Sequence, residues 1–449
     1  MLVFDLIVIG TGSAGATVAQ KAREAGKAVA IIDKLPFGGT CSQRGCDPKK
    51  VLVGAAEIIA RSEQMIGKGV THQPAIDWPE LMTFKKTFTN PVPQRTEIKF
   101  ADLGIQAFHG VASFSSANTV RVGEDELQAD HIVLATGLEP KPLDIPGEEL
   151  LIDSTGFLDL PQLPDKIVMV GGGYIAFEFA HIAARAGAQV TILHQGERPL
   201  EGFDADLVAV LVKAMESIGI RIMLNATVTA VSGKEDELTV AYTQEKKSHS
   251  VSTNLVVHAA GRVVNSAELG LETAGVEVGK KGVLVNEFLQ SVSNSIVYAC
   301  GDVADKGLPL TPLASYEGNI VIDNILNGNR QTYQDTPTPS AVYTLPTLAS
   351  VGLTEEQAHA QGRKVKVTFQ ETSDWYSSRR INESFSAFKT LVDTETKEIV
   401  GAHLLGAGCD EVINLFTLAI KHRISAKDLG NTLFAYPTHG SDLSSMLPD

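Results

Sequence analysis

Several kinds of residue are scarce in this sequence, and each shortage excludes a class of protein. Only 4 of the 449 residues are cysteine, so the chain lacks the dense disulfide framework of small secreted domains. Lysine and arginine total 38 against 53 acidic residues, and the net charge of −15 argues against a nucleic-acid or membrane-surface partner. The composition, 44% apolar and 20% charged, also excludes a disordered, collagen-like or coiled-coil chain.

The apolar beginning of the chain lacks the features of an export signal. Met1–Ile9 contains Asp5, has no basic stretch and runs directly into a glycine-rich loop. We therefore interpret it as a first β-strand and not as a signal peptide, and we expect a cytoplasmic protein. At about 100 to 200 residues per domain, the chain has room for several domains.

One internal repeat organises the chain. The pattern of Ile7–Asp33 occurs again within Ile167–His194. In each copy a run of β-branched residues ends at Gly-x-Gly, a helix of small and apolar residues follows, and an Ala-Gly pair precedes a second short strand. Two such strand–helix–strand units are typical of dinucleotide binding and predict two nucleotide cofactors.

Other segments carry weaker signals of secondary structure. We expect a helix over Pro48–Ile66, buried strands in Ile132–Gly137 and Ser295–Asp302, and a helix after the second of these strands. From Thr336 onward, strand patterns alternate with helical ones such as Asp410–Lys421. This last section is predicted to be an α+β module without a nucleotide-binding turn.

The first glycine-rich turn combines all the features of a dinucleotide site. Gly10 makes the turn, Gly12 lets the backbone approach a pyrophosphate, and Gly15 lets the helix pack on the strand. The helix N-terminus favours anionic phosphates. Asp33 ends the second strand, where a carboxylate can accept hydrogen bonds from the ribose hydroxyls.

The second glycine-rich turn differs in two positions. It contains Gly171 and Gly173, but Ala176 takes the third glycine's place and His194 takes the place of the acid. The strand end has no carboxylate that would repel the 2′-phosphate of NADPH, and His194 and Arg198 can supply positive charge for it. These residues favour NADPH over NADH, although two nearby glutamates argue the other way.

Two of the cysteines lie close together at the predicted start of a helix. Cys41 and Cys46 flank a short linker, and Pro48 suits a first helical turn. The helix dipole and Lys49 stabilise a thiolate there, which indicates redox chemistry. The alternatives are a zinc half-site, for which the chain offers no second Cys or His pair, and two buried thiols. The other two cysteines are interpreted as packing residues.

These and further motifs run along essentially the whole chain. Beside the first Gly-x-Gly-x-x-Gly, they read GGTC-x-x-x-GC-x-PKK, ATG, GGGYIAFEFA, ACGD, LTPLA, SVGLTEEQA and GAGCDE. Together they resemble the class I flavoprotein (pyridine nucleotide) disulfide oxidoreductases, the group that contains glutathione reductase, dihydrolipoamide dehydrogenase and mercuric reductase.

The resemblance implies an α/β fold with two Rossmann-like domains of the three-layer ββα type and a C-terminal α+β dimerisation domain. Residues 1–147 and 262–335 would form the FAD domain, residues 148–261 the NAD(P)H domain and residues 336–449 the dimerisation domain. A homodimer that acts on a small-molecule substrate is implied, with FAD and NADPH as cofactors and NADH as the alternative coenzyme.

The resemblance also implies a mechanism, in which hydride passes from the nicotinamide to flavin N5 and electrons leave through a disulfide. Cys46 matches the flavin-proximal charge-transfer cysteine and Cys41 the interchange cysteine that attacks the substrate. Lys49 matches the lysine beside N5, Glu178 its acidic partner and Tyr174 the tyrosine that covers the flavin. Asp302 matches the aspartate that binds the ribityl chain.

From the same motifs, the implied cofactor contacts are Gly10, Gly12, Ser13, Ala14, Gly15, Asp33, Lys34, Gly39, Thr40, Cys41, Cys46, Lys50, Ala135, Thr136, Gly137, Gly171, Gly173, Tyr174, Ile175, Glu178, His194, Arg198, Gly261, Arg262, Gly301, Asp302, Leu310, Thr311 and Pro312.

The sequence departs from the family at the proton-transfer residues. Tyr436 stands where the family has the catalytic histidine, and Ser441 stands where it has the glutamate that orients it. A phenol, with a reference pKa of about 10, is a poorer base near neutrality than an imidazole at about 6.5. Either Tyr436 acts as the proton donor, or His439, helped by Asp442, substitutes; the alternative is that His439 is a surface loop residue.

The substrate pocket departs as well. Gln20 and Asn319 occupy positions where glutathione reductases place arginines for the glutathione carboxylates, which disfavours that substrate. Mercuric reductases share the tyrosine at position 436, but they use a C-terminal cysteine pair that the final segment SSMLPD lacks.

Three functions therefore compete. The leading hypothesis is an NAD(P)H-dependent flavoenzyme whose Cys41–Cys46 disulfide reduces a small disulfide, an activity of the EC 1.8.1 type. The second keeps the cofactors but sends electrons to a quinone, oxygen or a metal ion, with the cysteine pair as an accessory that tunes or protects the flavin. The third is a flavin-bound redox sensor or scaffold.

Overall fold

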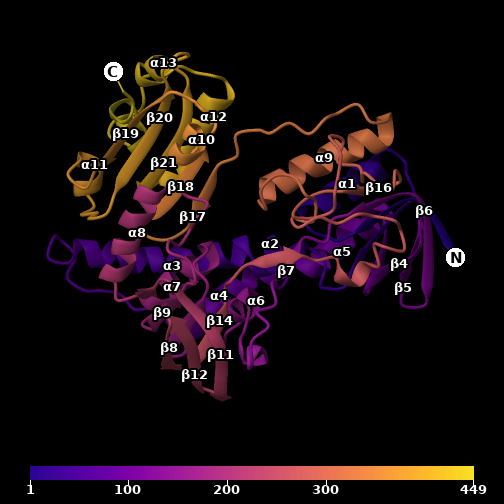
Figure 1. Ribbon diagram of the computed structural model, residues 1–449, viewed down its shortest axis with the longest axis horizontal. Coiled ribbons are helices and arrows are strands. Elements are labelled where there is room, and N and C mark those ends of the chain that lie inside the picture. The colour runs from indigo at the N-terminus through magenta and orange to yellow at the C-terminus, as the bar shows by residue number, and fades with distance from the viewer. Residues whose placement is uncertain (449) are drawn as a thin grey trace. The chain divides into compact units, whose positions relative to one another are not determined.

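The computed structural model describes residues 1–448, which group into two compact units, each built from separate stretches of the chain (Figure 1). The first unit contains residues 1–49, 84–141 and 262–335, and the second contains residues 50–83, 142–261 and those from 336 onward. Residues 50–83 were expected in the FAD domain, and their contacts group them with the second unit. Within residues 1–448, every helix is too short or too polar to span a bilayer.

The first unit is built on a seven-stranded sheet. Its elements are β1 (Leu2–Ile9), α1 (Ser13–Glu24), β2 (Val29–Asp33), α2 (Gly39–Arg44), the start of α3 (Cys46–Met65), the end of α4 (Trp78–Thr89), α5 (Val92–Leu103), β3 (Gln106–His109), β4 (Ala112–Ser116), β5 (Thr119–Val122), β6 (Asp125–Leu134), β7 (Leu138–Pro140), β15 (Arg262–Val264), η2 (Ala267–Leu269), β16 (Val297–Ala299) and α9 (Thr311–Asn327).

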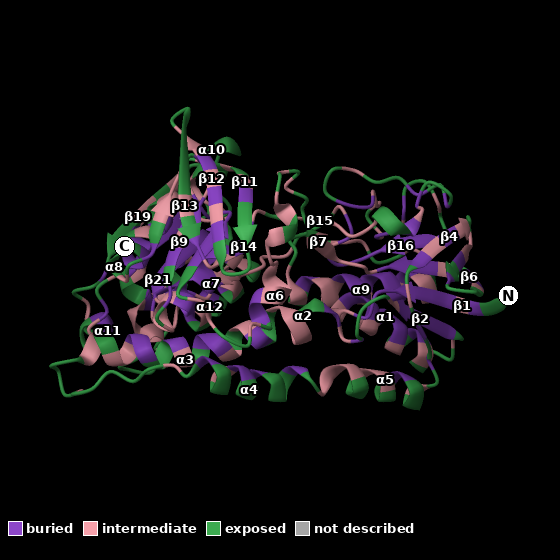
Figure 2. Cartoon of the chain, turned by 90° about the horizontal axis from the view of Figure 1, so that it is seen from below, coloured by how far each residue is buried: buried purple, intermediate pink, exposed green. Residues whose placement is uncertain are grey.

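The strand order β3-β2-β1-β6-β5-β4 places the first predicted strand in the middle of this sheet, parallel to β2 and β6. β2 and the second half of β1 are almost wholly buried, as expected for parallel strands covered on both faces (Figure 2). β16 returns from far along the chain and pairs with β6. Residues 262–335 therefore return to the first unit.

Small residues bring α1 close to its neighbours in the first unit. Its buried face consists of Ala14, Gly15, Val18, Ala19 and Ala22. These side chains are short enough for α9 to pack directly against α1 (Figure 1). The end of β1, the start of α1, the end of β16 and the start of α9 thus meet at one edge of the sheet.

The second unit contains three further sheets. Its elements are the rest of α3 and the start of α4, η1 (Glu148–Leu150), α6 (Ser154–Leu158), β8 (Lys166–Val170), α7 (Tyr174–Arg185), β9 (Gln189–Leu193), α8 (Ala205–Ser217), β10 (Arg221–Met223), β11 (Ala226–Lys234), β12 (Glu237–Gln244), β13 (Lys247–Thr253), β14 (Leu255–His258), β17 (Ser340–Val342), β18 (Thr347–Gly352), α10 (Glu355–Ala360), β19 (Val365–Glu371), α11 (Tyr376–Arg379), β20 (Ala387–Asp393), β21 (Ile399–Gly406), α12 (Cys409–Lys421), α13 (Ala426–Gly430) and η3 (His439–Met446).

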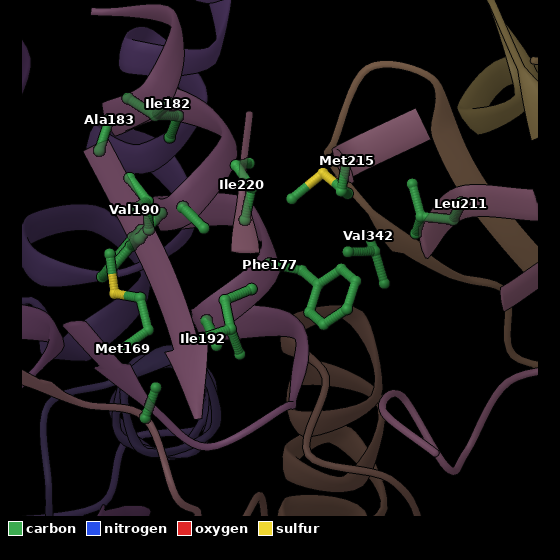
Figure 3. Packing of buried hydrophobic residues seen from close by; sticks show 14 of the residues in the cluster. Met169, Phe177, Ile182, Ala183, Val190, Ile192, Leu211, Met215, Ile220 and Val342 are labelled. Carbon is green, nitrogen blue, oxygen red and sulfur yellow. The ribbon is translucent and has the colours of Figure 1, made fainter. Parts of the chain in front are cut away.

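The second repeat forms a parallel sheet of order β10-β9-β8-β14, beside the antiparallel sheet β11-β12-β13. The C-terminal part forms an antiparallel sheet of order β17-β18-β21-β20-β19, so the expected α+β module without a nucleotide turn is present. Phe177 of α7 lies beside Val342 of β17 in one hydrophobic cluster, which joins the repeat to this module (Figure 3).

Candidate active site

The glycines of the first turn divide into two kinds. A Cβ atom on Gly10, whose φ is +112°, would lie 2.2 Å from the carbonyl oxygen of Ala135, and one on Gly15 would lie 2.0 Å from that of Gly10. These two glycines are therefore required by the protein's own packing. A Cβ atom on Gly12 would meet only the Cα of Gly39, at 3.9 Å. The open side of the turn is thus at Gly12, where a pyrophosphate fits.

The second turn has the same division of roles. Gly171 has a φ of +120°, and a Cβ atom there would lie 2.2 Å from the carbonyl oxygen of Ala259. A Cβ atom on Gly173 would meet nothing within 4 Å. Ala176, in the third place, lies in α7 and is fully buried. Both turns therefore leave a cradle at the second glycine, which fits two dinucleotides.

Asp33 is held in place by a residue that the motif does not specify. Its Oδ2 accepts hydrogen bonds from the backbone N–H of Thr11, at 2.9 Å, and from its hydroxyl, at 2.6 Å. The same hydroxyl oxygen accepts a hydrogen bond from the N–H of Gly38, at 3.0 Å. Thr11 thus joins the predicted ribose-binding acid to the segment that leads to Cys41. Its position between two glycines is the only sequence signal for this role.

The turn at Asp302 meets the first glycine-rich turn. A Cβ atom on Gly301 would lie 3.3 Å from the Cβ of Ala14 and 3.4 Å from that of Ala314, so β16, α1 and α9 converge there. Arg262 places a guanidinium nitrogen 3.8 Å from Asp302 Oδ2. Burial raises the pKa of the Asp302 carboxyl, and Arg262 opposes that rise.

Two successive helices bring Cys41 and Cys46 together. Cys41 lies in α2, Cys46 begins α3, and Gly45 is the only residue between the bounds of the two helices. A Cβ atom on Gly45 would lie 2.9 Å from the carbonyl oxygen of Thr40, so this tight connection favours glycine. The expected helix is confirmed, with its start at Cys46 itself, two residues before Pro48.

The two thiols share one proton unequally. A hydrogen bond from Cys41, together with smaller contributions from Thr311 and Lys49, lowers the pKa of Cys46 to about 6 against the effect of burial. The same hydrogen bond, together with burial, raises the pKa of Cys41. Thr311 Oγ1, at the start of α9, lies 3.7 Å from the Cys46 sulfur. Cys46 is therefore the thiolate at neutral pH.

The remaining predicted residues of the second unit lie mainly around α7. Glu178 is 1% exposed, and its Oε1 accepts a hydrogen bond from the N–H of Tyr343, at 2.9 Å. Tyr174, the first residue of α7, is 40% exposed. Lys50 Nζ lies 3.9 Å above the Tyr343 ring and 3.2 Å from Asp410. Lys49 and Glu178 belong to different units, and their pairing stays a prediction.

His194 and Arg198 form contacts within their own loop. His194 Nε2 lies 3.0 Å from the carbonyl oxygen of Arg198. The Arg198 guanidinium donates to the carbonyl oxygens of Phe203 and Glu201, at 3.2 and 3.3 Å. A Cβ atom on Gly172 would lie 2.5 Å from His194 Cγ, so the imidazole occupies the space beside this glycine.

Tyr436 and His439 differ in their surroundings. Tyr436 is 80% exposed, whereas His439 begins η3 and lies close to Gly408. Burial, with arginines nearby, lowers the pKa of His439. Asp442, expected to assist His439, accepts a hydrogen bond from the Ser377 hydroxyl.

The other candidate residues occupy the ends of elements. In the first unit, α1 begins with Ser13 and Ala14, α2 begins with Gly39 and Thr40, and α9 begins around Leu310, Thr311 and Pro312. Strand β2 is followed by Lys34, which pairs with Glu268, and strand β6 is followed by Ala135, Thr136 and Gly137. The first turn of α7 contains Ile175, and the start of β15 is at Gly261 and Arg262.

Two dinucleotide cradles and a thiolate at a helix start define a redox enzyme with two nucleotide cofactors. A family model described as "Pyridine nucleotide-disulphide oxidoreductase" matches residues 4–318, and its dimerisation domain matches residues 338–446. The chain belongs to this family, whose members use FAD and NAD(P)H. The predicted resemblance, fold class and cofactors are confirmed, and the protein is an NAD(P)H-dependent disulfide oxidoreductase by family.

Its relatives have several names. The chain is 33% identical to a glutathione reductase of Nostoc sp., with 99% of each chain covered. It is 32% identical to a mercuric reductase of Lysinibacillus sphaericus, covering 98% of this chain and 81% of that one. A solved Cu(II) complex of the HOCl-induced flavoprotein disulfide reductase RclA from Escherichia coli has a TM-score of 0.89 at 29% identity, with 99% of both chains covered.

Proposed function

We propose that the enzyme passes electrons from NADPH through FAD to the Cys41–Cys46 pair, and from Cys41 to a small disulfide. The observation that carries this proposal is the thiol pair at the start of α3, where Cys46 lies 3.7 Å from the Thr311 hydroxyl oxygen and its pKa is lowered to about 6, while the pKa of Cys41 is raised. Gly12 and Gly173 mark the open sides of the two turns that would hold FAD and the coenzyme. When bound, FAD supplies the step that couples the two-electron coenzyme to the thiols.

The protein's own steps are a thiol–disulfide exchange. Cys41, once deprotonated, attacks one sulfur of the substrate, the substrate disulfide bond breaks and one thiolate leaves. The Cys46 thiolate then attacks the Cys41 sulfur, which restores the protein disulfide and releases the second thiolate. The substrate gains two electrons and two protons: the cysteine pair supplies both electrons and the proton of Cys41, and the second proton comes from solvent. Tyr436 is the proposed proton donor because it is exposed and stands at the family's proton-transfer position, and His439 is the alternative.

The residues around the pair support a substrate without paired carboxylates. Asn319, which stands in place of an arginine, donates its side-chain amide to the carbonyl oxygen of Ser315, at 2.7 Å, within α9. Gln20 likewise carries no charge. A site without these two arginines loses the bidentate partners of an anionic peptide disulfide such as oxidised glutathione.

We also propose a homodimer, formed through the family's dimerisation domain. Leu433 is 98% exposed and Leu418 52% exposed, and such apolar side chains are typical of a surface that a partner covers. Light scattering of the holoenzyme tests this, and a monomeric mass contradicts it. The cytoplasmic location stays a prediction.

The electron path is tested by anaerobic titration of the flavin-loaded enzyme with NADPH, and separately with NADH, while the visible spectrum is recorded. A long-wavelength charge-transfer band should appear after two electrons in the wild type, because the Cys46 thiolate would be the residue that donates charge to bound flavin. Cys46→Ser should lack the band, whereas the matched variant Cys41→Ser should keep it. Direct bleaching of the flavin without a band contradicts the proposal.

A second acceptor class is favoured by one observation. RclA was solved as a Cu(II) complex, and residues 1–448 of this chain contain no group of three His, Cys, Asp or Glu side chains placed to hold a metal. A reducible metal ion would therefore use the thiol pair itself, with two one-electron reductions per dithiol. Steady-state NADPH oxidation with Cu(II) that exceeds the rate with every small disulfide tested would favour this acceptor.

A further inference from the structure

Glu317 is a buried carboxyl group that the mechanism above does not use. It lies in the second turn of α9 and is 1% exposed. Among residues 1–448, no lysine, arginine or histidine forms an ion pair with it. Burying a carboxylate without a cationic partner is unfavourable in free energy, so the group must be neutral or stabilised by hydrogen bonds.

The carboxyl group fills the space between two loops of the first unit. Its Oε2 accepts a hydrogen bond from the N–H of Gly301, at 2.7 Å. Gly301 has a φ of +73° and directly precedes Asp302. On the other side, a Cβ atom on Gly307 would lie 2.8 Å from Glu317 Oε1 and 3.0 Å from the Tyr333 hydroxyl oxygen. Glu317 thus holds the turn that carries the predicted ribityl-binding aspartate.

The helix that carries Glu317 cannot easily move away from this turn. A Cβ atom on the next residue, Gly318, would lie 2.9 Å from the carbonyl oxygen of Ala14, so α9 rests on the backbone of α1. The same helix begins at Thr311, whose hydroxyl oxygen lies 3.7 Å from the Cys46 sulfur. The Glu317 carboxyl group therefore connects the Asp302 turn to α9, the helix whose Thr311 also stabilises the Cys46 thiolate.

We propose that Glu317 is a positioning residue for FAD: through its hydrogen bond to Gly301 it fixes the Gly301–Asp302 turn against α9, and so determines how tightly the flavin is held. This role does not depend on the electron acceptor, and it stands apart from the proposed substrate.

The ionisation of Glu317 supports this role. Burial raises its pKa to about 8, against the effect of the Gly301 N–H, so the group is protonated at neutral pH. The titratable groups that face it are Cys300 and Asp302 from the β16 turn and Tyr333 from the loop after α9. Burial raises the pKa of all three, that of Tyr333 to about 12. Cys300 and Tyr333 therefore stay neutral between pH 7 and 9.

The test measures the Kd of FAD for the apoprotein by quenching of flavin fluorescence. Glu317→Gln retains a neutral side chain whose oxygen can accept the Gly301 hydrogen bond, and should keep the Kd within about threefold of the wild type. Glu317→Ala leaves the Gly301 N–H without its acceptor and should raise the Kd by about tenfold or more.

Asn324→Ala is the matched control. Asn324 lies on the same helix, is also 1% exposed and is fully hydrogen-bonded, but its partners are Phe288, Arg330 and Gln331. It should lower the Tm of the apoprotein without changing the Kd of FAD. Equal Kd values for Glu317→Ala and the wild type overturn the proposal, as does an equal rise in Kd for the two alanine variants.

A pH series separates positioning from mere stability, and it decides the question even if Glu317→Ala does not fold. Above about pH 8 the wild type acquires a buried negative charge beside Asp302, so its Kd for FAD should rise between pH 7 and 9. Glu317→Gln has no such charge and its Kd should change less over the same range. The same pH dependence in both proteins overturns the proposal.

Discussion

The two glycine-rich turns have the same backbone but differ in one pair of side chains. In the first turn Thr11, between the glycines, binds Asp33 at the end of the second strand. In the second turn Gly172 takes the place of Thr11, and the ring of His194 lies against it. In each turn the residue between the glycines lies against the residue at the strand end, so the two must fit beside each other.

This difference suggests how one motif holds two ligands. A carboxylate at the strand end suits unmodified ribose hydroxyls, whereas an imidazole there does not repel a 2′-phosphate. Both proposed NADPH contacts already bond within their loop: His194 Nε2 lies 3.0 Å from the carbonyl oxygen of Arg198, and the Arg198 guanidinium donates to two loop carbonyl oxygens. The four predictions that follow test or refine the comparison.

The largest effects are expected from one matched pair of variants, Gly12→Ala and Gly173→Ala. Both positions have backbone angles open to any residue, and an added methyl group meets no protein atom closer than 3.9 Å. The clash is therefore with the ligand alone, and should cost about 100-fold in affinity. Gly12→Ala should lose FAD, whereas Gly173→Ala should keep its yellow colour and show a raised KM for the coenzyme. Loss of flavin from Gly173→Ala would contradict this division of roles.

The second prediction transplants the pair from the first turn. Gly172→Thr should destabilise the protein by about 2 kcal/mol, because a Cβ atom there would lie 2.5 Å from His194 Cγ. Adding His194→Asp should recover most of this loss and shift the ratio of kcat/KM values toward NADH by about tenfold. Urea unfolding and steady-state kinetics measure the two effects. Additive losses in the double variant would show that the two positions are independent.

The third prediction concerns the thiolate, which only the first unit carries. The pKa of Cys46 is lowered from an ordinary value of 9.0 to about 6, so the thiolate is present above that pH and is lost below it. Thr311→Val removes a hydrogen bond that lowers this pKa, and should move the midpoint to higher pH with about fivefold less thiolate at pH 6. Alkylation rates of the reduced enzyme against pH measure the midpoint. Thr311→Ser, which keeps the hydroxyl, should behave like the wild type.

The smallest effect is expected from Thr11→Val. The substitution removes the hydroxyl that donates to Asp33 and accepts from Gly38, but leaves the backbone hydrogen bond to Asp33. A loss of about 1 to 2 kcal/mol in the free energy of unfolding should follow, measured in urea. Thr11→Ser is the control and should lose much less. A neutral Thr11→Val would mean that Asp33 does not need this partner.

Much of the fold was predictable because its signals are local. A strand that ends at Gly10 and the helix that follows it lie within one short stretch of sequence, and the same holds for the repeat at Gly171. The helix after the cysteines was predicted from Pro48, and the structure starts it at Cys46. The grouping of residues 50–83 with the second unit had no local signal, since it depends on which surface they pack against.

The candidate site was predictable only where a motif specifies a residue type. Cys41 and Cys46 were found because their spacing suits two thiols at a helix start. Thr11 was missed because threonine between two glycines has no distinctive pattern, and Glu317 because a glutamate on an amphipathic helix usually faces solvent. Its burial depends on the small residue that follows it, Gly318, and on the position of α1.

By itself the sequence determined the two strand–glycine–helix units, the cysteine pair at a helix start and the family, because backbone conformation and motif spacing are encoded within a few residues. The tertiary structure alone decided which distant side chains meet. Thr311 reaches Cys46 across 265 residues of sequence, and Glu317 reaches Gly301 across 16. Such contacts follow from how helices and sheets pack in three dimensions, and that packing has no period or motif that can be identified along the chain.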